Sequence, residues 1–203
     1  MKTKWTGAVA LTAMTVGGLL LSPSILVGAK EDDKAKTGSA APAFKLKDTF
    51  GKEFSLADFK GKVVVLEWFN RKCPASKGCH NSATMQDTYK KYADKGVIWL
   101  AIDTTAGSDP EANRVYAADQ GLAYPILHDT DGKVGKAYGA KTTPHMFIID
   151  KEGILVYTGA IDNKGESPNY VGDALAEVLA GEKVTKSRTQ PYGCGGKYPP
   201  NAS

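Results

Sequence analysis

Cys73 is the residue of this sequence whose type and position most clearly indicate a catalytic role. It follows an apolar run, residues 63–69, whose composition predicts a strand buried on both faces. The run stops at polar residues, so the thiol is presented at the carboxyl end of a central strand. Ligands of open α/β sheets bind at that end of the strands, which makes Cys73 a candidate for thiol chemistry.

The residues around Cys73 favour a reactive thiolate over an inert buried cysteine. If Cys73 caps a helix, Pro74 takes the first helical position, where its missing N–H costs nothing. The thiol would then face the positive end of the helix dipole, with Arg71, Lys72 and Lys77 nearby. Such surroundings lower the pKa of a cysteine from about 8.5 into the range of about 3.5 to 7.5. We therefore expect Cys73 to be largely a thiolate at neutral pH.

The elements that must position this thiol alternate between strands and helices. Strands are expected at residues 43–46, 53–56, 63–69, 97–102, 124–127, 146–149 and 154–158, and helices at about 85–96, 109–121, 132–139 and 171–181. We expect the first two strands to form a short hairpin or a pair of edge strands, and the last two to form an antiparallel hairpin. This order predicts an α/β fold, with a mixed central sheet, helices on both faces and an N-terminal hairpin extension.

The chain divides into four stretches. We expect residues 1–29 to be a signal peptide, 30–42 a flexible linker, 43–181 the folded domain and 182–203 a C-terminal tail that carries Cys194. The linker is charged and lacks apolar periodicity, and the tail is rich in proline and glycine. A chain of 203 residues with 42% apolar content suffices for one well-filled core.

The first residues have the pattern of an export signal. Lys2 and Lys4 precede an apolar run, residues 5–21, and the small residues at 27–29 suit a signal peptidase. A membrane anchor is the alternative, because the run approaches the ~17 residues that a spanning helix needs, but its glycines and threonines weaken it. We expect a periplasmic or extracellular protein without stable membrane insertion after cleavage. With 26 basic and 22 acidic residues, the charge favours neither nucleic acid nor an anionic surface as a partner.

Two motifs resemble a known family. Glu67-Trp68-Phe69 precedes Cys73 by a few residues, and Thr143-Pro144 follows about seventy residues later. Together they resemble the thioredoxin fold in its exported redoxin, or AhpC/TSA, branch, which includes peroxiredoxin-like proteins and thiol-disulfide oxidoreductases. The similarity covers roughly residues 41–181.

The resemblance implies a role for each motif residue, and no cofactor. Cys73 matches the nucleophile, Pro144 the cis-proline beside it and Glu67 a buried carboxylate below the site. A cis bond before Pro144 would turn the backbone edge of Thr143 toward Cys73, where an extended substrate could pair with it. The buried carboxyl group of Glu67 could shuttle the proton of a resolving thiol.

The sequence departs from the thioredoxin pattern at the second cysteine. Ser76 stands where thioredoxins have the resolving thiol of Cys-x-x-Cys, so Cys79 or Cys194 must take that role. A helix would place Cys79 ~9 Å along its axis from Cys73, beyond the ~7 Å limit for a disulfide, so Cys79 can pair only if the stretch is irregular. The glycine-rich tail can bring Cys194 to the site, and similar tails in the redoxins favour it. A static bridge that pins the tail is the alternative.

Three functions remain open on the sequence alone. The favoured one is a thiol-disulfide oxidoreductase that acts on a protein or small-molecule disulfide and is recycled by a reductant of unknown identity. The second is a thiol peroxidase. Leu66 and Asn70 replace the proline and threonine that hold peroxide in peroxiredoxins, which argues against efficient peroxide reduction. The third is a copper-binding or delivery module built from Cys73, His80 and His145, although the ligand spacing is unusual and we predict no metal site.

Overall fold

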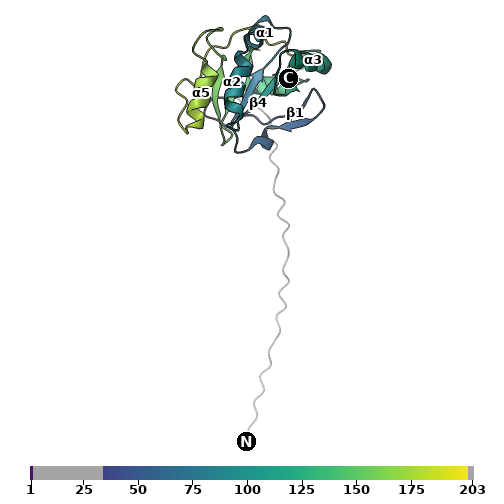
Figure 1. Ribbon diagram of the computed structural model, residues 1–203. Coiled ribbons are helices and arrows are strands. Elements are labelled where there is room, and N and C mark those ends of the chain that lie inside the picture. The colour runs from purple at the N-terminus through teal and green to yellow at the C-terminus, as the bar shows by residue number, and fades with distance from the viewer. Residues whose placement is uncertain (2–33, 201–203) are drawn as a thin grey trace. The chain divides into compact units, whose positions relative to one another are not determined.

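The computed structural model describes Met1 and residues 34–200 (Figure 1). The expected signal peptide therefore lies, apart from Met1, outside the described residues. Among the described helices, not one combines the length and the apolar character that crossing a membrane requires.

A seven-stranded mixed sheet forms the centre of the domain. Its order is β2-β1-β5-β4-β3-β7-β8. The strands are β1 (Lys45–Asp48), β2 (Glu53–Ser55), β3 (Val64–Trp68), β4 (Ile98–Asp103), β5 (Ile126–His128), β7 (His145–Ile149) and β8 (Leu155–Gly159). β3, β4 and β5 run parallel, whereas β1 and β7 pair antiparallel with their neighbours in this group. β3 is thus central, as its sequence, apolar except for Glu67, predicts.

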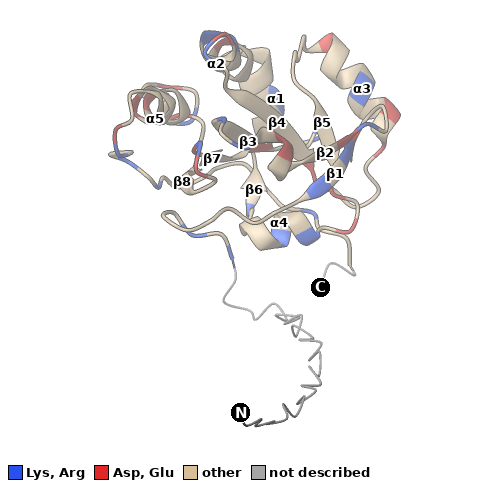
Figure 2. Cartoon of the chain, turned by 90° about the horizontal axis from the view of Figure 1, so that it is seen from below, with Lys and Arg blue, Asp and Glu red and all other residues tan. Residues whose placement is uncertain are grey.

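Helices cover both faces of this sheet. They are α1 (Pro74–Asn81), α2 (Thr84–Ala93), α3 (Pro110–Asp119), α4 (Lys133–Tyr138) and α5 (Tyr170–Leu179), with a 3-10 turn η1 at Leu56–Phe59. Buried residues of α1, α2 and α5 share one apolar cluster, and those of α4 belong to a second. Figure 2 shows α4 on the other side of the sheet from α1, α2 and α5. The predicted fold class, including the N-terminal hairpin, is confirmed.

Successive side chains of β3 point to opposite faces of the sheet, so this strand contributes to both apolar clusters. Val65 belongs to the cluster under α1, α2 and α5, while Leu66 and Trp68 belong to the cluster on the α4 side. Full burial of a side chain such as Leu66 contributes about 1.5–3 kcal/mol to stability. Glu67 lies among these positions with no exposed surface, so the apolar strand fixes the place of a buried carboxyl group.

Two segments expected to be loose are held against the domain. Residues 34–42 were predicted to belong to a flexible linker, but Ala35 N–H donates to Ala137 O at 2.8 Å and Gly38 N–H donates to Leu155 O at 2.8 Å. The linker prediction is therefore wrong for these residues, because composition does not reveal such backbone pairing. In the tail, β9 (Cys194–Gly195) pairs antiparallel with β6 (Thr142–Thr143), as a two-stranded sheet apart from the main one.

Candidate active site

Cys73 occupies the place that the sequence predicts for it. It is the N-cap residue of α1, with extended backbone angles (φ −79°, ψ 122°), and Pro74 follows at the start of the helix. Its side chain is almost fully buried, with 2% of its surface exposed. The thiol donates a hydrogen bond to Thr143 O, at 2.9 Å from Sγ, and so faces the segment that precedes Pro144.

The pKa of Cys73 reflects two opposed effects. Burial raises the pKa, but hydrogen bonds from Cys194, from Thr143 and from the Ser76 backbone outweigh it and lower the pKa from 9.0 to about 7. The direction matches the sequence prediction. The main contributions, however, are hydrogen bonds rather than the neighbouring cations. The lowered pKa increases the thiolate share at neutral pH, and the thiolate is the form in which a cysteine acts as a nucleophile.

Cys194 is brought to Cys73 by the pairing of β9 with β6. The register places Cys194 opposite Thr143, the residue whose carbonyl oxygen accepts from Cys73. The hydrogen bond with Cys73, which holds the proton on the Cys194 thiol, raises the pKa of Cys194. The two thiols thus influence each other's pKa, and no disulfide joins them in this structure.

The peptide bond between Thr143 and Pro144 is cis, as the resemblance implies. The backbone edge of Thr143, expected to receive a substrate, is occupied by the protein's own tail. Gly193 permits this close approach. It has a φ of +115°, and a Cβ there would collide with the carbonyl oxygen of Thr143. The tail thereby lies in the position that an extended substrate would take.

The carboxyl group of Glu67 lies in a buried polar network. Oε1 lies 2.9 Å from Nε2 of His80, while Oε2 accepts hydrogen bonds from Trp99 and Tyr124, each at 3.1 Å. Nδ1 of His80 in turn lies 3.0 Å from the hydroxyl of Tyr116. The direct partner of the carboxyl group is therefore His80 and not a cysteine thiol. The sequence reasoning considered His80 only as a metal ligand and missed this pairing.

The two histidines of the copper hypothesis are engaged elsewhere. His145 accepts from the Lys141 backbone N–H through Nδ1 at 3.2 Å, so Nε2 carries the proton and donates to Thr158 at 3.0 Å. Burial lowers the pKa of His145 to about 4. Among the described residues, no group of three ligating side chains is arranged to hold a metal ion. These hydrogen bonds argue against the copper hypothesis.

Cys79 lies on a regular helix, so the irregular stretch that its pairing with Cys73 requires is not there. Its side chain is 5% exposed and belongs to the apolar cluster. Burial raises the pKa of Cys79 to about 11, and its Sγ lies 3.4 Å from the hydroxyl of Tyr192. Cys79 thus has the character of an inert interior thiol.

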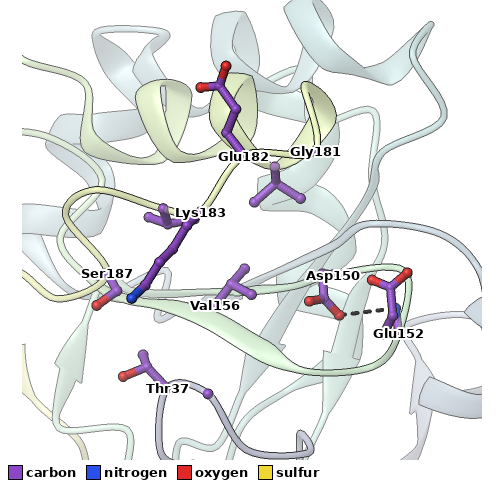
Figure 3. Close-up of a pocket in the computed structure, with 11 residues that line it drawn as sticks. Thr37, Asp150, Glu152, Val156, Gly181, Glu182, Lys183 and Ser187 are labelled. Carbon is purple, nitrogen blue, oxygen red and sulfur yellow. Dashed lines mark hydrogen bonds between the residues drawn. The ribbon is translucent and has the colours of Figure 1, made fainter.

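Another pocket lies away from this thiol pair. It forms between the end of α5 and the turn that joins β7 to β8, with Asp150, Glu152 and Lys183 among the side chains in Figure 3. None of its lining residues is a cysteine or a histidine. This pocket therefore offers no thiol or imidazole for redox chemistry.

Comparisons with known proteins agree with this geometry. The sequence model of the family described as Redoxin matches residues 36–174. Thiol-disulfide oxidoreductase ResA from Bacillus thuringiensis subsp. konkukian is 34% identical over 156 residues, which cover 76% of this chain and 82% of that protein. Chloroplastic peroxiredoxin Q from Triticum aestivum is 32% identical over 152 residues, which cover 70% of this chain and 66% of that protein.

Solved structures agree on the architecture. A hypothetical protein from Sinorhizobium meliloti 1021 superposes with a TM-score of 0.74 at 26% identity, over 82% of this chain and 97% of that chain. An uncharacterized conserved protein from Geobacillus kaustophilus gives a TM-score of 0.73 at 28% identity, over 81% of this chain and 93% of that chain. The fold therefore extends over nearly the whole described domain.

Proposed function

The chain belongs to the redoxin family and is a thiol-based oxidoreductase, and we propose that it reduces disulfides through the pair Cys73 and Cys194. The observation that carries the proposal is the register of β6 and β9, which sets Cys194 opposite Thr143 while Cys73 donates to the carbonyl oxygen of Thr143. The similarity to thiol-disulfide oxidoreductase ResA supports the disulfide as substrate.

The proposed reaction has three steps. The Cys73 thiolate attacks one sulfur of the substrate disulfide, breaks the S–S bond and releases the first thiolate. Cys194, once deprotonated, attacks the Cys73 sulfur of the mixed disulfide and releases the second thiolate. The two products take up two protons, one from Cys194 and one from solvent, and an external dithiol then reduces the Cys73–Cys194 bond and is itself oxidised.

Before a bulky disulfide can react, the tail must leave the Thr143 edge, because Cys73 is 2% exposed beneath it. The freed edge of β6 then offers backbone groups to an extended substrate segment. Cys194 returns with the tail to resolve the adduct. Tail pairing therefore couples substrate entry to resolution.

The proposed role of Glu67 in proton transfer now includes His80. Glu67, His80 and Tyr116 form a chain of hydrogen-bonded side chains that leads away from the buried carboxyl group. Tyr116 lies on α3 at the rim of a surface groove. We propose that these groups hold and move the proton, while Cys73 and Cys194 make and break the bonds.

Peroxide is the second candidate substrate, because peroxiredoxin Q is among the similar proteins. In that reaction the Cys73 thiolate takes one oxygen from the peroxide to give a sulfenic acid and an alcohol or water. Cys194 then condenses with the sulfenic acid to form the disulfide and release water. Leu66 and Asn70 replace the proline and the threonine that hold peroxide in peroxiredoxins. We therefore expect the reaction with peroxide to be slow.

We also propose that the protein is exported to the periplasm or the extracellular space. Lys2 and Lys4 before an apolar run support a cleaved signal peptide, which would leave no stable membrane insertion. An oxidising compartment would suit a cysteine pair that cycles between thiols and a disulfide.

Activity measurements on two variants test the proposed function. Cys73→Ser should abolish reduction of 2-hydroxyethyl disulfide. The reaction of Cys194→Ser should stop after one turnover, with one half of the substrate joined to Cys73 as a mixed disulfide. Full turnover by the Cys73→Ser protein would overturn the proposal. Stopped-flow mixing with hydrogen peroxide separates the second candidate, since a rate no better than that of free cysteine excludes an efficient peroxidase.

A further inference from the structure

A groove lies between α1 and α3, and no residue of the tail is among those that line it. Its volume is about 630 Å³. It is lined by Arg71, Lys72, Lys77, Asn81, Ala112, Val115, Tyr116, Asp119 and Gln120. We call it the basic groove. Two of its cations directly precede Cys73 in the chain, and Lys77 lies one helical turn after it, so a molecule held in the groove lies beside the reactive segment.

The charge of the basic groove is one-sided. Arg71, Lys72 and Lys77 contribute three cations, and Asp119 is the one acidic residue of its lining. In the described part of the chain, none of these three cations forms an ion pair. Unpaired cations gathered on one surface attract an anionic group.

The basic groove also has an apolar component. Val115 is 51% exposed, although large apolar side chains are mostly buried in this domain. Tyr116 beside it is held in place, because its hydroxyl lies 3.0 Å from Nδ1 of His80. Tyr116 and Arg71 are of the residue types enriched at protein interfaces, and the exposed Val115 offers an apolar contact that a simple ion would leave unused.

We propose that the basic groove docks an acidic, extended segment of the protein partner whose disulfide reacts with Cys73. This inference rests on the proposed function and names the class of partner for the same site. Carboxylates of the segment pair with Arg71, Lys72 and Lys77, and an apolar side chain packs on Val115. A segment docked in the basic groove does not displace the tail, so β9 can stay paired with β6 until the reaction begins.

Exchange kinetics with charged peptides test the docking. Two peptides of equal length carry one cysteine as a mixed disulfide with 2-mercaptoethanol, flanked by aspartates and a leucine in one and by lysines and a leucine in the other. The reduced protein should react at least about tenfold faster with the acidic peptide at ~10 mM ionic strength. At ~0.5 M salt, where the Debye length is only a few ångströms, the difference should fall below about twofold.

Charge reversal locates the effect. The double variant Lys72→Glu/Lys77→Glu should prefer the basic peptide. The matched control is Lys60→Glu/Lys62→Glu, which reverses the charge of two other exposed lysines. These lysines precede the amino end of β3, whereas Cys73 follows the carboxyl end of that strand. This control should keep the wild-type preference. Each rate is divided by the rate with neutral 2-hydroxyethyl disulfide, which removes any effect of the substitutions on the Cys73 thiolate itself.

The outcomes separate the two levels of the proposal. If the neutral disulfide is not reduced by the wild-type protein, the proposed function is wrong. If it is reduced but the acidic and basic peptides react equally, or if the control variant changes the preference as much as Lys72→Glu/Lys77→Glu does, the docking site is wrong and the function stands.

Discussion

The tail strand makes a direct prediction at Gly193. Its φ of +115° is strained for a residue with a side chain, and a Cβ would collide with the backbone oxygen of Thr143, which cannot move aside as a flexible side chain would. Gly193→Ala should therefore destabilise the pairing of β9 with β6 by about 2 kcal/mol. At 1.4 kcal/mol per factor of ten, the opening equilibrium of the tail rises about 30-fold.

Alkylation of Cys73 by iodoacetamide measures this opening. Cys73 is 2% exposed in the closed state, so its labelling rate follows the population of open molecules when opening and closing are fast. We expect the rate in Gly193→Ala to be about 30-fold higher than in the wild type. Gly195→Ala is the matched control, because a Cβ at Gly195 meets nothing within 4 Å, and its rate should stay within about twofold.

A second effect must be separated from the first. The pKa of Cys73 is lowered to about 7 in part by Cys194, so loss of the tail also raises this pKa and reduces the thiolate at neutral pH. The rates are therefore compared at pH values high enough for the alkylation rate of each variant to have reached its plateau. A plateau rate for Gly193→Ala equal to that of the wild type would refute the conclusion that the tail covers Cys73.

Three further predictions concern titration and stability. Cys194→Ala removes a hydrogen bond to the thiolate, so the midpoint of the pH profile for Cys73 alkylation should move upward from about 7, and a downward move would contradict the geometry. His80→Leu leaves the buried carboxyl group of Glu67 without one of its partners, and urea unfolding should report a loss of about 1–3 kcal/mol. Burial lowers the pKa of His145 to about 4 from 6.5. The unfolded chain therefore binds this proton first, and the stability present above pH 6.5 falls by about 3 kcal/mol as the pH drops to 4; His145→Asn should remove most of that slope in denaturant titrations.

The sequence predicts well the parts of the site that depend on local patterns. The buried strand β3 follows from a run that is apolar except for Glu67, and the N-cap position of Cys73 follows from a proline at the first helical position. The position of Thr143-Pro144 beside the thiol follows from a family motif. The first two features are decided by residues close together in the chain, whereas the third joins residues about seventy positions apart and was predicted only through the family resemblance.

Long-range pairing could not be predicted in the same way. Nothing in the composition of the tail indicates that Cys194 lies opposite Thr143 in a two-residue ladder, since two-residue strands have no measurable periodicity. The contact of Glu67 with His80 joins a strand to a helix and depends on how α1 crosses the sheet. One indication was available, because Ser76 and His80 lie four residues apart on the inward face of a helix that begins at Pro74.

The central claim, that Cys73 and Cys194 form the redox pair, is tested most directly by mapping the cysteines before and after oxidation with 2-hydroxyethyl disulfide, with alkylation, proteolysis and mass spectrometry. The account predicts one peptide pair joined through Cys73 and Cys194 in the oxidised protein, with Cys79 recovered as a free thiol in both samples. A disulfide between Cys73 and Cys79, or oxidised protein in which Cys194 remains free, would contradict it.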